Sequence, residues 1–216
     1  MPDVFGDPAA FFGSFLLKLP ALLLAVTVHE VAHGLVADRL GDHTARLRGR
    51  LTLNPLPHID PLGAITFVLV GFGWAKPVPV DARNLRHPVR DMAWIAAAGP
   101  ASNFAVAFLG LVAFVLARRT TGVPLVTGPA AGVFLWVYRF NLALAIFNLI
   151  PLPPLDGGHF LPYFLPRQAW GLLHRLERYG PLLLLVVLLS GATRFVLDPV
   201  FHWVNEIYVA LLRIFL

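Results

Sequence analysis

His29 and His33 are four residues apart in the sequence His-Glu-Val-Ala-His, with Glu30 directly after the first histidine. On a helix, residues four apart project from the same face, so both imidazoles can bind one metal ion. Glu30 points about 100° further round the axis. This is the arrangement by which a helix binds zinc through two imidazoles and supplies a general base for the water that zinc activates.

The position of this motif in the chain adds to its meaning. It lies near the end of an apolar stretch, residues 9–37, in which Lys18 is the only charged residue before Glu30. Ionisable groups in an apolar helix are costly, and they are usually functional when they face the interior of a bundle. The alternative is a helix end at a membrane interface, where water hydrates all three side chains. We favour the metal site.

A catalytic zinc ion usually takes three protein ligands and leaves a fourth position open. The sequence contains no cysteine, so the third ligand must offer nitrogen or oxygen. Asp156 is the best-placed acid, because it follows the proline-rich break 151–154 at the end of an apolar segment, where the backbone can turn its carboxylate inward. Four other acids lie in polar loops and are expected to be solvated: Asp38, Asp42, Asp60 and Asp81.

The composition indicates an integral membrane protein. Hydrophobic residues make up 57% of the 216 residues, charged residues make up 13%, and the mean hydropathy is +0.72. Soluble domains average about 45–50% apolar and about 25% charged residues. The net charge of +5 is attributed to cytoplasmic loops and not to a nucleic-acid surface, because no basic cluster alternates with aromatic residues. The length predicts one membrane-embedded domain over residues 1–216, with a catalytic core at about 8–160 and C-terminal helices at about 175–216.

The expected fold class is an all-α polytopic membrane protein, a bundle of about 4–5 transmembrane helices with a short re-entrant or β-hairpin element at the cytoplasmic side. Residues 62–75 are too few to cross as a helix, and their β-branched residues and glycines favour that element. Residues 50–54 alternate like a short strand, and residues 76–81 predict an extended edge. Apolar segments predict spans at about 8–37, 91–117, 130–150 and 180–197, followed by an amphipathic or spanning helix at 199–216.

The distribution of Lys and Arg predicts the orientation. Segments 38–61, 76–90 and 151–178 hold four, four and three of these residues, and all three lie on one side if 62–75 enters the membrane and returns. The positive-inside rule makes this side cytoplasmic. The prediction is a multi-pass protein of the cell inner membrane with its N-terminus outside. His33 and Asp156 then lie at similar depth near the cytoplasmic side.

The motif His29-Glu-Val-Ala-His33 and the later segment Asn148-Leu-Ile-Pro-Leu-Pro-Pro-Leu-Asp156-Gly157 together resemble the paired motifs of the site-2 protease family of intramembrane zinc metalloproteases. The segments Gly99-Pro100-x-x-Asn103, 49–55 and 72–77 look like the short branch of this family that lacks a PDZ domain. The resemblance covers about residues 15–165.

The resemblance implies a function and assigns roles. His29, His33 and Asp156 would bind one catalytic Zn²⁺, Glu30 would be the general base and later the proton donor, and Asn148 would hold the substrate backbone or the oxyanion. The expected activity is hydrolysis of peptide bonds within or near transmembrane segments, in regulated intramembrane proteolysis. The expected substrates are single-span membrane proteins or residual membrane peptides in the lipid bilayer.

Three further side chains are candidates to support the ligands. His58, in a proline-rich loop, could reach the site as a proton shuttle or could pack within its loop. Asn103 could hydrogen-bond across the bundle in a structural or a catalytic role. His159 follows the Asp156 turn.

A function of another class remains open, namely a metal-ion transporter or a non-proteolytic zinc-binding membrane scaffold. Transporters also place His and Asp in their spans. They do not need a glutamate beside a His-x-x-x-His pair, and they often have repeated halves, which this sequence lacks. Both features favour the protease.

Overall fold

The computed structural model describes residues 7–70, 73–121, 129–191 and 193–215. These residues form helices and loops with no β-strand, and one isolated antiparallel bridge joins Ile59 to Ala75. The all-α expectation is confirmed. The helices are α1 (Pro8–Arg39), α2 (Thr44–Leu47), α3 (Pro61–Val70), α4 (Pro88–Thr121), α5 (Pro129–Asn148), α6 (Asp156–Phe164), α7 (Trp170–Leu189) and α8 (Thr193–Phe215), with 3₁₀ turns η1 (Leu56–His58), η2 (Ala82–Asn84) and η3 (Arg167–Ala169).

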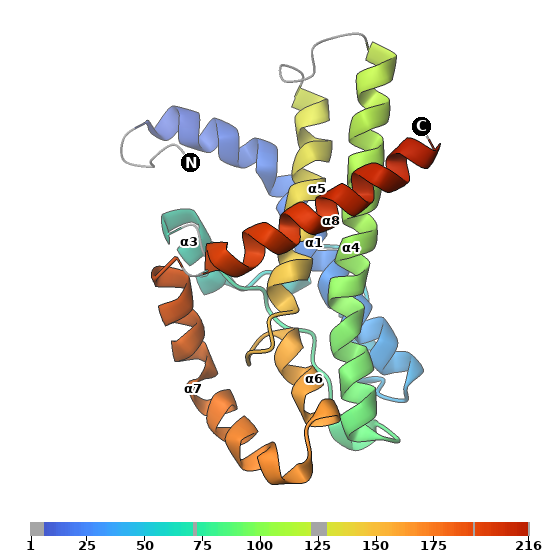
Figure 1. Ribbon diagram of the computed structural model, residues 1–216, viewed down its shortest axis with the longest axis vertical. Coiled ribbons are helices and arrows are strands. Elements are labelled where there is room, and N and C mark those ends of the chain that lie inside the picture. Colours follow the sequence, from blue (N-terminus) through green and yellow to red (C-terminus); the bar gives the residue numbers. More distant parts are fainter. Residues whose placement is uncertain (1–6, 71–72, 122–128, 192, 216) are drawn as a thin grey trace.

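Helices α1, α4 and α5 pack against one another as the centre of the fold (Figure 1). The backbones of α4 and α5 approach closely at Gly110, where a Cβ atom would lie 2.9 Å from the Tyr138 nitrogen. Small residues permit such close contacts between membrane helices. Of the helices in the described ranges, Phe12–Arg39 and Pro88–Ala117 are long and apolar enough to cross a membrane, and Gly132–Asn148 is a shorter apolar helix. The expected total of four to five spans is therefore not confirmed.

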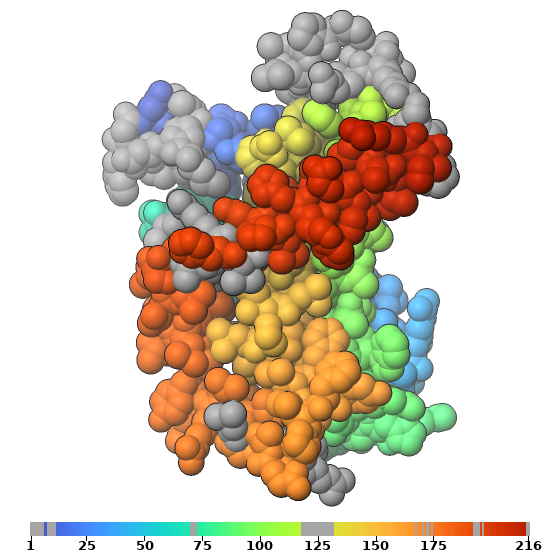
Figure 2. Space-filling model, viewed as in Figure 1, coloured from blue at the N-terminus to red at the C-terminus, as the bar shows by residue number. Residues whose placement is uncertain are grey.

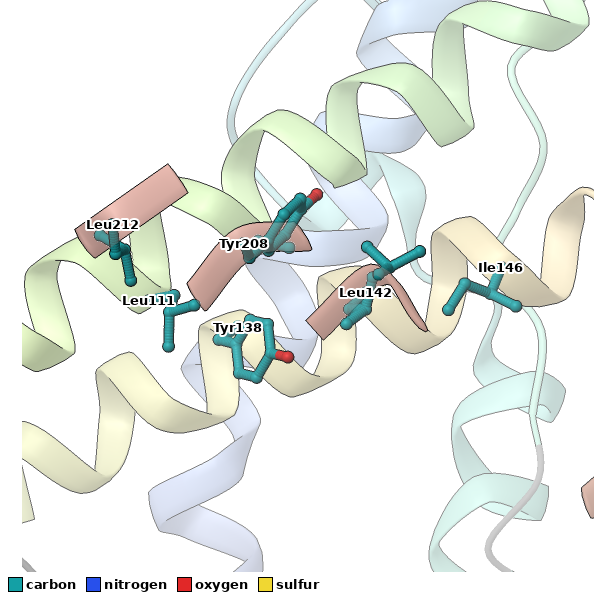
Figure 3. Close-up of a cluster of buried hydrophobic side chains, with 8 residues drawn as sticks. Leu111, Tyr138, Leu142, Ile146, Tyr208 and Leu212 are labelled. Carbon is teal, nitrogen blue, oxygen red and sulfur yellow. The ribbon is translucent and has the colours of Figure 1, made fainter. Parts of the chain in front are cut away.

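Helix α8 crosses the outside of this centre and contacts α5 (Figures 1 and 2). Its Tyr208 hydroxyl donates a 2.8 Å hydrogen bond to the Phe104 carbonyl of α4. The Tyr138 hydroxyl of α5 donates a 2.7 Å bond to Asn205 Oδ1. Apolar burial adds to these bonds in one cluster (Figure 3), whose buried members are Ala107, Leu111, Tyr138, Leu142, Ile146, Val204, Tyr208 and Leu212.

The prediction of one continuous membrane-spanning helix over residues 180–197 is wrong. Helix α7 ends at Leu189, and Gly191 has a φ of +71°. A glycine in this left-handed conformation just beyond the last helical residue is a common helix stop. The Gly191 amide also donates to the Leu188 carbonyl at 3.2 Å. The next helix, α8, begins at Thr193 and includes the helix expected at 199–216 as far as residue 215.

Residues 61–70 form helix α3, so the β-hairpin alternative for 62–75 is wrong over these residues. Residues 71–72 lie outside the described ranges. Asp60 stabilises the helix start, because its Oδ1 accepts a 2.9 Å bond from the Gly63 amide, and Pro61 suits the first helical turn. The chain then folds back onto that turn, since a Cβ atom on Gly63 would lie 2.1 Å from the Trp74 carbonyl oxygen. The strand expected at 50–54 is likewise absent, and these residues form a loop.

Asp42 is fully buried, which corrects the expectation of a solvated acid. Its carboxylate accepts hydrogen bonds from the Asp81 amide at 2.7 Å, from the Asn84 side chain at 2.8 Å, and from the amide and hydroxyl of Thr44. Burial alone would raise the pKa of Asp42, but these hydrogen bonds hold the pKa below its usual value. The ionised side chain therefore connects the end of α1 to the loop that precedes α4.

The prediction that Asp38 is a solvated loop residue is also wrong, because Asp38 lies in the last turn of α1 and is buried. It is 7% exposed, and its carboxylate pairs with Arg46 and with His43, whose Nδ1 lies 2.7 Å from Asp38 Oδ1. These contacts fix helix α2 against the end of α1. Asp60 and Asp81 are half-buried, and each accepts a hydrogen bond from a backbone amide two or three residues further along the chain.

Candidate metal centre

His29, His33 and Asp156 meet in space, although the aspartate lies more than 100 residues after the histidines in the sequence. Asp156 Oδ2 lies 3.1 Å from His29 Nε2 and 3.3 Å from His33 Nε2, and the two Nε2 atoms are 3.1 Å apart. Ligand atoms around a tetrahedral zinc ion lie about 3.4 Å apart, because zinc–nitrogen and zinc–oxygen distances are about 2.0–2.2 Å. Within the described part of the chain, no other group of three or more His, Asp or Glu residues meets in this way.

The hydrogen bonds of His29 determine which of its nitrogens can bind a metal. His29 Nδ1 lies 2.6 Å from Asn103 Oδ1. The Asn103 amide nitrogen donates to the Ala25 carbonyl at 3.0 Å and to Asn141 Oδ1 at 2.8 Å, which fixes the orientation of the Asn103 amide. Asn103 Oδ1 can therefore only accept, so Nδ1 of His29 carries the hydrogen and Nε2 offers its lone pair.

His33 is held in the same tautomer by a backbone group. Its Nδ1 donates to the Ile95 carbonyl of α4 at 2.7 Å, which leaves Nε2 facing His29 and Asp156. Asp156 Oδ2 is buried and accepts no hydrogen bond from a donor. Three lone-pair atoms thus converge in a nearly buried site without a hydrogen between them. This donor set fits a divalent cation, and its two imidazoles and one carboxylate suit zinc.

The turn that presents Asp156 is held by close backbone contacts. Helix α5 ends at Asn148 and α6 begins at Asp156, and α6 packs against α4. A Cβ atom on Gly157 would lie 2.3 Å from the Ile150 carbonyl oxygen, and one on Gly180 of α7 would lie 2.0 Å from the Pro153 carbonyl oxygen. Only glycine permits these approaches, so both ends of the turn are packed against backbone and the carboxylate has a fixed position.

Glu30 lies beside the three ligands and is not one of them. Its side chain is half-buried, and its Oε2 accepts a 2.7 Å hydrogen bond from the Val78 backbone amide. A carboxylate next to two imidazole ligands that is itself held by an amide can serve as a proton acceptor for a water molecule at the metal.

The structure brings only one of the three proposed supporting side chains to the ligands. Asn103 binds His29 directly. His58 is fully buried, but its Nε2 donates to the Thr52 carbonyl at 3.0 Å within its own loop. His159 is exposed on α6. Asn148, the expected substrate or oxyanion residue, is half-buried and donates to the Leu144 carbonyl of its own helix at 3.0 Å.

Sequence reasoning missed three groups that shape the centre: the Ile95 carbonyl, the Val78 amide and the side chain of Asn141. The first two are backbone groups, which no side-chain pattern reveals. Asn141 lies within the apolar segment 130–150, and a buried amide of this kind is a signal for a hydrogen bond between helices.

Gly99 of α4 leaves the space that the imidazole rings of His29 and His33 occupy. A Cβ atom there would lie 2.5 Å from His33 Cε1 and Nε2 and 2.6 Å from His29 Cε1. We expect Gly99→Ala to displace both rings and to lower zinc affinity about 10- to 100-fold, the loss typical of disturbed ligand support. Zinc titration of the purified protein against a competing chelator measures this loss. Gly171→Ala is the control, because a Cβ atom at Gly171 meets nothing within 4 Å; equal affinity of both variants would contradict the prediction.

A sequence profile of Peptidase family M50 matches residues 124–177, which include Asp156. The chain is 37% identical over 185 residues, 84% of each sequence, to a Bacillus subtilis protein named "Putative zinc metalloprotease YwhC". Rip2 of Mycolicibacterium smegmatis, which has a name of the same form, is 30% identical over 86% of this chain and 71% of its own length. MJ0611 of Methanocaldococcus jannaschii also carries the name "Putative zinc metalloprotease". It is 25% identical over 74% of this chain and 76% of its own length. No solved structure matches the chain.

Proposed function

Because the chain belongs to peptidase family M50, we propose that it is an intramembrane zinc metalloprotease in which His29, His33 and Asp156 hold the metal. One observation carries this assignment of residues. Three lone-pair atoms meet at 3.1–3.3 Å, and the residue after His29 supplies a further carboxylate that is not part of this group. The convergence supports a metal site, and the additional carboxylate supports hydrolysis over storage or transport of the ion.

A zinc ion held by these residues would polarise the scissile carbonyl and lower the pKa of a water molecule, which would make that water easier to deprotonate for the attack. Glu30 takes a proton from the attacking water and passes it to the leaving amine. Asn103 and the Ile95 carbonyl keep the two imidazoles in the tautomer that directs Nε2 to the metal. Asn148, at the end of α5 before the Asp156 turn, is proposed to hold the substrate backbone once its side chain leaves the Leu144 carbonyl.

The proposed location is the inner membrane, with several spans and an N-terminus on the outer side. Support comes from the two helices long enough to cross, α1 and α4, and from the Lys and Arg residues concentrated in segments 38–61, 76–90 and 151–178. His29 and His33 lie in the last third of α1, close to the basic segment, so the centre is proposed to lie near the cytoplasmic side. Single-span membrane proteins and residual membrane peptides are the proposed substrates.

The test is cleavage of a single-span reporter by the purified protein in lipid vesicles. We expect cleavage that stops after treatment with a zinc chelator and returns when about one equivalent of Zn²⁺ is added, because the site offers three ligands to one ion. Zinc flux across the vesicles without any cleavage would overturn the proposal and favour the transporter. Zinc binding with neither flux nor cleavage would overturn it in favour of a scaffold.

A further inference from the structure

Glu30 receives its hydrogen bond from a segment with a single available donor. Val78 donates its amide to Glu30 Oε2 at 2.7 Å across 48 residues of sequence. Its two neighbours are Pro77 and Pro79, and proline has no backbone N–H. Residues 77–79 therefore offer one amide hydrogen in all, and it is directed at the carboxylate beside the metal ligands.

Segment 76–80 is fixed on both sides of Val78. On one side, Arg50 Nη2 donates to the Lys76 carbonyl at 2.7 Å, and the Lys76 amide donates to the His58 carbonyl at 2.9 Å. On the other side, the Asp81 amide donates to buried Asp42 at 2.7 Å. The prolines restrict φ within the segment. The amide of Val78 thus has little freedom to follow a moving side chain, and it can hold Glu30 in place.

The side chain of Val78 sets the direction of its amide. Val78 is 8% exposed, and its Cγ1 would lie 3.2 Å from a Cβ atom on Gly34. Gly34 is four residues after Glu30 and so lies on the same face of α1, one turn further along. Packing of Val78 against the small surface at Gly34 brings the amide into line with the Glu30 carboxylate.

We propose that the backbone amide of Val78 is a positioning group for the general base. It holds Oε2 of Glu30 and leaves Oε1 as the oxygen that exchanges protons with water and the leaving amine. This inference rests on the proposed function. Removing a hydrogen bond to a charged group, or misplacing a catalytic group by about 1 Å, lowers the rate about 10- to 100-fold. The effect is expected on kcat, because the Val78 amide binds the general base.

The experiment replaces the amide of Val78 with an ester, by incorporating the α-hydroxy analogue of valine at position 78. This change removes the N–H and keeps the side chain. We expect kcat for a single-span reporter to fall about 10- to 100-fold, with KM and zinc content unchanged. The same ester at Val80 is the matched control and should retain kcat within about threefold. Val78→Pro, which also lacks the N–H, should reproduce the loss.

The outcomes separate this inference from the proposed function. If the unmodified protein cleaves the reporter and the position-78 ester cleaves it equally fast, the positioning role is wrong. Loss of zinc from the ester variant would also overturn it, because the amide would then support the fold of the site and not the base. Absence of cleavage by the unmodified protein would instead contradict the protease assignment itself.

Discussion

Replacing Glu30 with glutamine is expected to lower reporter cleavage about a thousandfold while zinc stays bound at one ion per chain. Glutamine keeps the size of the side chain, and its amide oxygen can still accept the Val78 hydrogen bond. It cannot accept a proton from water at neutral pH, so only the proton transfer is lost. The three ligand atoms belong to other residues, and their hydrogen bonds to Asn103 and the Ile95 carbonyl are unaffected.

Cleavage and zinc content are measured on the same preparation. Glu177→Gln is the control, because Glu177 is an exposed glutamate on α7 and the substitution makes the same chemical change. Retention of more than a tenth of the cleavage rate by Glu30→Gln would remove Glu30 from the mechanism. A transporter or scaffold would show similar behaviour for both variants.

The three candidate ligands that meet in the structure could be selected from the sequence because each follows from a local rule. The spacing of His29 and His33 matches the helical repeat, and a helix over about 8–37 was clear from its continuous apolar residues. Asp156 was found by elimination among the acids and by its position after a proline-rich break. Nothing local showed that these residues meet. That depends on the packing of α6 against α4 and of α4 against α1.

The structural predictions that proved wrong concern segments where local sequence preference and long-range contacts favour different structures. The β-branched residues of 62–75 favoured an extended element, yet Asp60 and Pro61 start a helix there and the chain folds back onto Gly63. Asp42 was expected at the surface because its neighbours in sequence are polar. It is buried because groups about 40 residues away, the Asp81 amide and the Asn84 side chain, supply its hydrogen bonds. Such partners are invisible in a single sequence.

Asp156→Ala is expected to abolish stoichiometric zinc binding and, with it, all detectable cleavage. The substitution leaves two imidazoles to hold the ion, and the loss of supporting residues alone costs about 10- to 100-fold in metal affinity, so removal of a ligand should cost more than about 100-fold. The carboxylate also supplies the only negative charge among the three ligands. The turn is held by close backbone contacts at Gly157 and Gly180, so we expect it to keep its position after the substitution.

Zinc affinity is measured by competition with a chelator of known affinity, and folding is checked by thermal unfolding of the protein without metal. Asp198→Ala, at an exposed position on α8, is the control and should bind zinc normally. Three lone-pair atoms that converge without a hydrogen repel one another, so the metal-free protein should be no less stable after Asp156→Ala. A variant that unfolds more readily without metal would show that Asp156 stabilises the turn independently of zinc. A variant that still binds one tight zinc ion would show that the third ligand lies elsewhere in the chain.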